Sequence, residues 1–135
     1  MSEKRNPNPP AGKTTERKDH EPPAATSRMG WRYHHMGIPT RIRRPGERHI
    51  PHLKLFVSGF EESPYGIEWM RFEKGCPIQE LVQSIPHIAF EVDNLESALA
   101  GKEIISEIIS PSEGTRVAYI RDNGTPVELI EFRRR

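Results

Sequence analysis

The sequence has a single cysteine, Cys76, which excludes an intrachain disulfide framework and is typical of a reducing compartment. It also has no apolar run near the roughly 18 residues that a membrane-spanning helix needs. Neither sign of charge dominates, because 20 lysines and arginines stand against 19 aspartates and glutamates. A dedicated nucleic-acid binder usually has a strong basic excess, so we expect neither a nucleic acid nor a membrane as partner.

Residues 1–29 also have almost no aliphatic side chains and are rich in proline, lysine, glutamate, asparagine and threonine. Such a segment buries too little apolar surface to offset its loss of conformational entropy, so we predict a disordered tail. It has no apolar stretch of a secretory signal, and its acidic residues are not typical of a transit peptide. We therefore expect a cytoplasmic protein with one domain over residues 30–135.

From residue 31 onward the sequence predicts a β-rich domain. In the first half, turn residues separate predicted strands at residues 32–40, 52–59 and 66–72, a loop at residues 40–51 and a brief helical turn at residues 78–82.

The second half has the clearer pattern. The predicted elements are a strand at residues 85–92, a helix at 95–100, a strand at 103–109, and hairpin strands at 116–121 and 126–132. Asp93 or Asn94 can cap the helix, and Gly101 can end it. Asn123-Gly124 is the strongest short signal for a hairpin turn.

A weak internal repeat relates the two halves. Residues 35–38 match residues 87–90, each with a histidine, an aliphatic residue, a very small residue and an apolar one. Residues 67–72 match residues 127–132, each with a β-branched residue, a glutamate and, four positions after the glutamate, a phenylalanine. The repeat predicts a duplicated module with polar residues at matched strand positions.

The spacing within the two copies differs by about one short helix. His35 and Glu68 are 33 residues apart, whereas His87 and Glu128 are 41 residues apart. The second copy contains the predicted helix at residues 95–100, and the first copy has no counterpart. The first module is therefore interpreted as an abbreviated copy of the second.

Strand alternation groups the glutamates with bulky apolar residues. Residues two apart on a strand share a face, so Glu68 shares a face with Met70, and Glu128 shares one with Ile130. Such a mixture of polar and apolar groups on one face is compatible with a ligand cavity.

Residues 32–132 resemble the vicinal oxygen chelate superfamily, which includes glyoxalase I, methylmalonyl-CoA epimerase, fosfomycin-resistance proteins and extradiol dioxygenases. The segment PHIAFEVDNLESAL resembles the start of a second module in the epimerase and glyoxalase branches, and VELIEF resembles the strand that supplies a glutamate ligand. The resemblance implies an α+β fold in which paired βαβββ modules form a cupped, barrel-like mixed sheet. The modules would span about residues 31–74 and 84–132, the first of them abbreviated.

The resemblance also implies one divalent metal ion held by His35, Glu68, His87 and Glu128. His34 could take the place of His35 only by facing the other way. Two imidazoles and two carboxylates suit Zn, Ni, Co, Mn or Fe. The implied activity is proton transfer next to a metal-polarised carbonyl of a small metabolite or thioester, as in an epimerase, isomerase or glyoxalase-type lyase.

The general base stays open at this point. A carboxylate displaced from the metal, Glu68 or Glu128, would serve as the base, and so would a separate group such as Glu47 or Glu91.

Other members of this superfamily offer alternative functions. An extradiol dioxygenase or a thiol transferase needs two histidines and one glutamate, so Glu68 would then not bind metal. A metal-free binding or resistance protein would instead have an apolar groove. Abbreviated members also suggest a homodimer. Four arginines in the predicted loop either grip a carboxylate or phosphate of the substrate or are simply solvated: Arg41, Arg43, Arg44 and Arg48.

Overall fold

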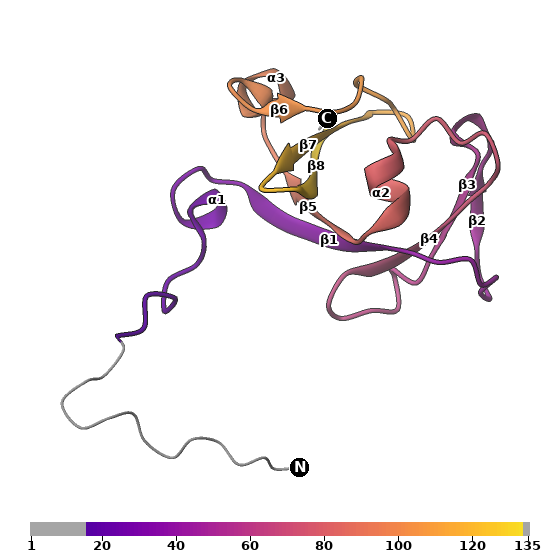
Figure 1. Cartoon of the computed structure of the whole chain (residues 1–135), viewed down its shortest axis with the longest axis horizontal. Coiled ribbons are helices and arrows are strands. Elements are labelled where there is room, and N and C mark those ends of the chain that lie inside the picture. Colours follow the sequence, from indigo (N-terminus) through magenta and orange to yellow (C-terminus); the bar gives the residue numbers. More distant parts are fainter. Residues whose placement is uncertain (1–15, 134–135) are drawn as a thin grey trace, which may run out of the picture.

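The computed structural model describes residues 16–133, in which one eight-stranded sheet is combined with a few short helices (Figure 1). The first module contains β1 (Arg32–Pro39), β2 (Arg48–Ile50), a 3-10 turn (Pro51–Leu53), β3 (Leu55–Ser58) and β4 (Ile67–Phe72). After α2 (Glu80–Ser84), the second module contains β5 (His87–Glu91), α3 (Leu95–Leu99), β6 (Glu103–Ile104), β7 (Thr115–Asp122) and β8 (Thr125–Phe132).

The order of strands is symmetric about the centre of the sheet. The sequence β2-β3-β4-β1 on one side is mirrored by β6-β7-β8-β5 on the other, and the antiparallel pair β1 and β5 joins the two halves. Within each module the first and last strands are parallel, β1 with β4 and β5 with β8. The predicted α+β class, with paired modules in a cupped mixed sheet, is therefore confirmed, and the first module has no helix between its first two strands.

The second module follows its local sequence signals. Asn94 caps α3, since its side-chain oxygen accepts a hydrogen bond from the Ser97 N–H at 2.8 Å. Between β7 and β8, Asn123 and Gly124 both have positive φ angles, 54° and 78°, which the tight two-residue turn requires. This turn sets the register of the hairpin, in which Tyr119 lies opposite Glu128.

The structure differs from the predictions in three segments. The predicted loop at residues 40–51 contains β2, and the predicted strand at 52–59 begins later because Lys54 adopts a left-handed φ of 55°. The predicted strand at 103–109 pairs with β7 only at Glu103–Ile104 and again at Ile109. Between them, the Ile105 N–H still donates to the Tyr119 carbonyl oxygen, but the Tyr119 N–H donates to the Ser106 hydroxyl, so a side chain replaces one backbone acceptor.

The apolar core lies on both faces of the second module. On the outer face, α3 packs against β7 and β8, where Leu95 and Leu129 are fully buried. On the inner face, residues of both modules and of α2 form a second cluster around Val82, Val117 and Ile130. Strand alternation therefore separates a packed outer layer from an inner layer that faces the hollow of the sheet.

Residues 16–23 extend away from the sheet (Figure 1). The predicted disordered tail lies partly outside the described residues. Its described part, residues 16–29, includes the one-turn helix α1 (Ala24–Ser27), which has no buried residue. No helix within residues 16–133 is both long and apolar enough to cross a membrane.

A bidentate ion pair holds the loop after β1 against the sheet. The Arg71 guanidinium of β4 donates to both carboxylate oxygens of Glu47, at 2.8 and 2.7 Å. Arg71 also lies over the Phe56 ring, with its guanidinium carbon 4.3 Å from the ring centroid. This arrangement connects the loop that replaces the missing helix with the strand that carries Glu68.

We predict that Glu47→Gln lowers the melting temperature at neutral pH and has a smaller effect in acid. The Arg71 guanidinium lowers the pKa of Glu47 from 4.5 to about 2. The ion pair therefore stabilises the fold above the unfolded pKa and is lost as the pH falls toward about 2. Circular dichroism melts near pH 7 and near pH 3 measure the difference. The exposed carboxylate variant Glu113→Gln is the control, and an equal loss for Glu47→Gln at both pH values would contradict the prediction.

Candidate functional site

The repeat places its four polar residues at equivalent positions of the sheet. His35 and His87 lie on the central strands β1 and β5, and Glu68 and Glu128 lie on the neighbouring strands β4 and β8. The register of the parallel pairs is also equivalent, because Gly37 is opposite Glu68 and Ala89 is opposite Glu128. The pseudo-twofold relation thus brings all four side chains to the same face near the centre of the sheet.

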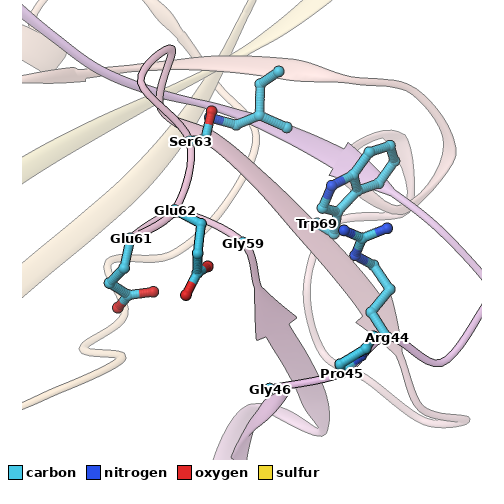
Figure 2. A pocket seen from close by; sticks show the side chains of 9 residues that line it. Arg44, Pro45, Gly46, Gly59, Glu61, Glu62, Ser63 and Trp69 are labelled. Carbon is cyan, nitrogen blue, oxygen red and sulfur yellow. The ribbon is translucent and has the colours of Figure 1, made fainter.

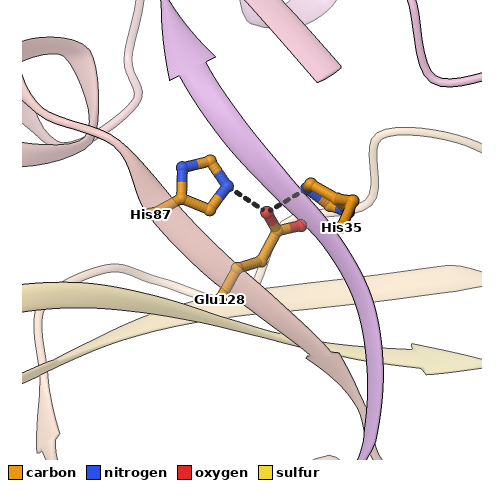
Figure 3. Close-up of side chains that lie close together, drawn as sticks. All are labelled: His35, His87 and Glu128. Carbon is orange, nitrogen blue, oxygen red and sulfur yellow. Dashed lines mark hydrogen bonds and ion pairs between the residues drawn. The ribbon is translucent and has the colours of Figure 1, made fainter. Parts of the chain in front are cut away.

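Three close contacts connect the four polar groups. Figure 3 shows Glu128 between the two imidazoles, with Oε1 2.8 Å from His87 Nε2 and 3.3 Å from His35 Nε2. His35 Nε2 is also 3.5 Å from Glu68 Oε1. His35, His87 and Glu128 are buried and can bring one donor atom each within 4.8 Å of the others. Glu68 contacts this group from the edge through His35.

The very small residues of the repeat make room for the histidines. In the antiparallel pairing of β1 and β5, Gly37 lies opposite His87 and Ala89 lies opposite His35. A Cβ atom on Gly37 would overlap the His87 imidazole and would lie 2.6 Å from its Nε2. The matched pattern of a histidine followed two residues later by a very small residue therefore has a steric cause: each small residue accommodates the histidine of the other strand.

A cavity of about 490 Å³ opens on the inner face beside these groups. His35, Glu68 and Glu128 line it, whereas His87 is fully buried behind them. Its remaining wall is mainly apolar, formed by Ile50, Leu53, Leu55, Val57, Phe60, Met70, Ile78, Ile109, Pro111, Val117, Ile130 and Phe132. The predicted faces of Met70 and Ile130 are confirmed by their place in this wall.

His34 also lines the cavity, although strand alternation predicts that it faces away from His35. The pairing of β1 with β5 shifts between Tyr33 and His35, which is a β-bulge that lets both histidines point inward. His34 Nδ1 lies 2.8 Å from His35 Nδ1, and its ring stacks on Phe60 with centroids 5.0 Å apart. This contact holds the Nδ1 side of His35, so its Nε2 faces the carboxylates.

The local electrostatics push the pKa values of the two glutamates apart. Burial raises the pKa of Glu128, but its contacts with His35 and His87 outweigh burial and lower the pKa below its usual range. Burial also raises the pKa of Glu68, and the opposing effect of His35 does not cancel it. Burial lowers the pKa of His35, whereas the two carboxylates raise it, with a net rise. Glu128 is therefore the more strongly held carboxylate.

Several features fit a bound cation. Within residues 16–133, the buried side-chain atoms without a hydrogen-bond partner are His35 Nε2, His87 Nδ1 and Arg44 Nε. His35 Nε2 thus faces two carboxylate oxygens without a hydrogen bond to either. Donor atoms of one ion, with metal–ligand bonds of about 2.1 Å, lie about 3.0–3.4 Å apart, close to the distances around Glu128. The two imidazoles and two carboxylates are also a donor set that suits borderline divalent ions.

Tyr119 belongs to the site but was not among the residues expected from the sequence. Its ring meets His87 edge-on with centroids 5.5 Å apart, and it lies opposite Glu128 in the pairing of β7 with β8. Burial and the carboxylates of Glu128 and Glu68 raise the pKa of Tyr119 well above 10, so the phenol stays protonated. The two-residue Asn123-Gly124 turn sets Tyr119 opposite Glu128, so the hairpin signal offered a way to find it.

Other residues considered from the sequence do not line this cavity. Glu47 pairs with Arg71, and Glu91 lies 3.5 Å from Arg32. The Cys76 thiol donates to the Leu53 carbonyl oxygen at 3.0 Å. Of the four loop arginines, only Arg48 lines the cavity.

Comparison with known proteins supports the fold. No protein-family model matches the sequence, and no curated protein matches it. Among solved structures, a hypothetical protein of Bacillus halodurans, BH1468, matches with a TM-score of 0.60 and 19% identity over 78% of this chain and 96% of that chain. Methylmalonyl-CoA epimerase of Mycobacterium tuberculosis matches with a TM-score of 0.49 and 15% identity over 76% and 88%. The first likeness shows a shared fold, and the second is too weak to add to it.

We predict that Gly37→Ala destabilises the fold by about 1–3 kcal/mol, the usual cost of overpacking. The added Cβ displaces the His87 ring, while the strand backbone of residue 37 accepts alanine. Urea unfolding of the wild type, Gly37→Ala, His87→Ala and the double variant gives a thermodynamic cycle. In the His87→Ala background the alanine should cost little, because the overlapping ring is gone. The same cost in both backgrounds would show that the His87 ring is not the cause.

Proposed function

We propose that this chain is a metal-dependent enzyme of the glyoxalase and epimerase type, in the vicinal oxygen chelate superfamily. It would transfer a proton to or from the carbon atom next to the carbonyl group of a small metabolite or thioester. The observation that carries the proposal is the convergence of two imidazoles and two carboxylates, from symmetric strand positions, at the wall of one cavity.

The residues that would hold the ion are His35, Glu68, His87 and Glu128. One divalent ion there, such as Zn, Ni, Co, Mn or Fe, would supply Lewis acidity toward a substrate with two neighbouring oxygens. The orphaned Nε2 atom of His35 supports this role, because a neutral imidazole binds a metal through its unprotonated nitrogen. His34 supports it by contacting the other ring nitrogen, as partners of metal-bound histidines usually do.

Glu68 is the carboxylate that we assign as the general base. Glu128 is held between two histidines, whose Nε2 atoms lie 2.8 and 3.3 Å from its Oε1. Glu68 contacts only the edge of the cluster, 3.5 Å from His35, and its side chain faces the cavity. A base must lie within reach of the substrate proton, and Glu68 combines this access with freedom to leave the cluster.

The apolar wall would keep water away from the reacting atoms. Leu55, Met70, Val117 and Ile130 are each 5% exposed or less and lie around the polar cluster. In such surroundings, charges interact more strongly than they do in water.

A three-donor site is the second candidate, because His35, His87 and Glu128 form the tight group and Glu68 lies outside it. This set corresponds to the two-His, one-Glu arrangement of an extradiol dioxygenase or a thiol transferase. The reducing cytoplasm and the homodimer, expected from the lone cysteine and the resemblance respectively, stay predictions.

We predict that protein purified without chelators contains about one divalent ion per chain and that His87→Ala loses it. Elemental analysis and calorimetric Zn²⁺ titration measure this. His49→Ala is the control, because His49 forms an exposed pair with Glu73, at 2.8 Å, outside the cavity. A partial loss in Glu68→Ala supports the four-ligand set, and full retention supports the three-donor alternative. Failure of the wild type to bind any divalent ion would refute the metal site.

We predict that the metal-loaded protein exchanges the carbon-bound proton next to a carbonyl with solvent deuterium. Proton NMR across a panel of 2-oxo acids and acyl thioesters follows the exchange. Glu68→Gln should slow it by about 10²–10⁴-fold at equal metal content, as expected for loss of a general base. Glu73→Gln is the control at the exposed His–Glu pair. The proton-transfer proposal does not survive if no compound of the panel exchanges, and the role of Glu68 does not survive if Glu68→Gln exchanges at the wild-type rate.

A further inference from the structure

Arg48 is the only lysine or arginine among the described residues that line the cavity. It lies on β2 opposite Val57 of β3, and both side chains line the cavity wall near Glu68. The Arg48 side chain is 66% exposed, so it lies at the mouth of the cavity rather than inside it. Its charge still acts on Glu68, since it opposes the effect of burial on that carboxyl group.

Glu61 pairs with Arg48 at this mouth. Arg48 Nη1 lies 3.2 Å from Glu61 Oε2, and the Glu61 side chain is 62% exposed. Glu61 follows β3 and lines the same cavity. An exposed pair of this kind contributes little to stability. A carboxylate brought by a ligand can therefore take the place of Glu61 at small cost.

Arg44, in contrast, is turned to the other side of β4. Figure 2 shows Arg44 beside Trp69, across a hollow from Glu61 and Glu62. The Arg44 guanidinium carbon lies 4.8 Å from the Trp69 ring centroid. Trp69 follows Glu68 in β4 and so points to the opposite face of the sheet. Arg44 thus lines a separate pocket with Trp69. Neither Arg41 nor Arg43 is part of the cavity wall.

Among residues 16–133, the cavity wall offers a ligand no permanent cation other than Arg48. Beyond the polar cluster the wall is mainly aliphatic and aromatic, with Ser112 and Thr115 as hydroxyl groups. A carbon chain can lie along the apolar wall, but a second negative charge on the ligand has to meet Arg48. The planar guanidinium can match a carboxylate in shape as well as in charge, and Arg48 already pairs with the Glu61 carboxylate through Nη1.

We propose that Arg48 selects substrates that carry a carboxylate at the end remote from the reacting carbonyl, and that this carboxylate displaces Glu61. The inference rests on the proposed function, because it assumes that the reacting end of the substrate lies at the His35, Glu68, His87 and Glu128 cluster. It narrows the substrate class from small oxygenated metabolites to acids with a distal carboxylate, and it makes Arg48 a specificity-determining residue.

Calorimetry with matched ligands tests this selection on full-length protein loaded with Zn²⁺. The ligand pairs are 2-oxoglutarate with 5-methyl-2-oxohexanoate, and 2-oxoadipate with 6-methyl-2-oxoheptanoate. In each pair an isopropyl group replaces the distal carboxylate at nearly equal shape. We expect the wild type to bind the dicarboxylate of at least one pair about tenfold more tightly. Arg48→Met should remove this preference, and Glu61→Gln should increase it, because the competing carboxylate is gone.

Arg43→Met is the matched control, since Arg43 is an exposed arginine of the same loop that does not line the cavity. It should keep the wild-type preference. If Zn²⁺ and the 2-oxo acids bind but neither dicarboxylate is preferred, or if Arg48→Met keeps the preference, the role of Arg48 is wrong and the metal site stands. If Zn²⁺ itself fails to bind in the titration that precedes the ligands, the proposed function fails. An unchanged preference in Glu61→Gln would overturn the displacement of Glu61.

Discussion

The candidate site depends on a single antiparallel register, the pairing of β1 with β5. In this register Gly37 lies opposite His87 and Ala89 lies opposite His35, so each imidazole occupies space that the other strand leaves free. A slip of one residue between the two strands would turn one of the two histidines to the outer face of the sheet, where α3 packs. The close fit of the His87 ring over Gly37 favours the observed register, because a Cβ atom at position 37 would overlap that ring.

The same register imposes an electrostatic cost on the centre of the sheet. His35, His87 and Glu128 are each less than 7% exposed, so their polar groups are removed from water. A buried pair of this kind contributes little net stability, because desolvation offsets its Coulomb attraction. The apolar layer under α3 and the inner cluster around Val117 provide the stabilisation instead. The polar cluster is therefore better explained by binding or chemistry than by a need for stability.

Much of this arrangement could be predicted from local sequence, and the exceptions share a physical cause. The Asn123-Gly124 turn and the Asn94 cap act within a few residues, so their signals are readable. The repeat predicted polar residues at matched strand positions, and the family resemblance implied that two histidines and two glutamates meet. The structure brings them together, while their role as metal ligands stays a proposal. The bulge at His34 was not predictable, because it arises only when β1 pairs with a strand more than 50 residues away.

The importance of Arg48 was hidden for the same reason. The short strand β2 has no apolar alternation and lies between prolines, so its residues read as a loop. Only the pairing of β2 with β3 separates Arg48 from the other loop arginines, by setting it opposite a residue of the cavity wall. Long-range pairing, rather than local propensity, decided this position.

The two modules contribute different properties to one cavity, although they have the same order of strands. On the outer face of β8, Leu129 is fully buried under α3. At the equivalent position of β4, Trp69 is only partly buried and has Arg44 over its ring. The missing helix of module 1 explains this difference, because the short loop that replaces it covers less of the sheet.

The loss of that helix also leaves β2 and the chain after β3 free to line the mouth of the cavity with charged side chains. The second module thus supplies the packed support, and the abbreviated first module supplies the charged mouth through which a ligand would enter.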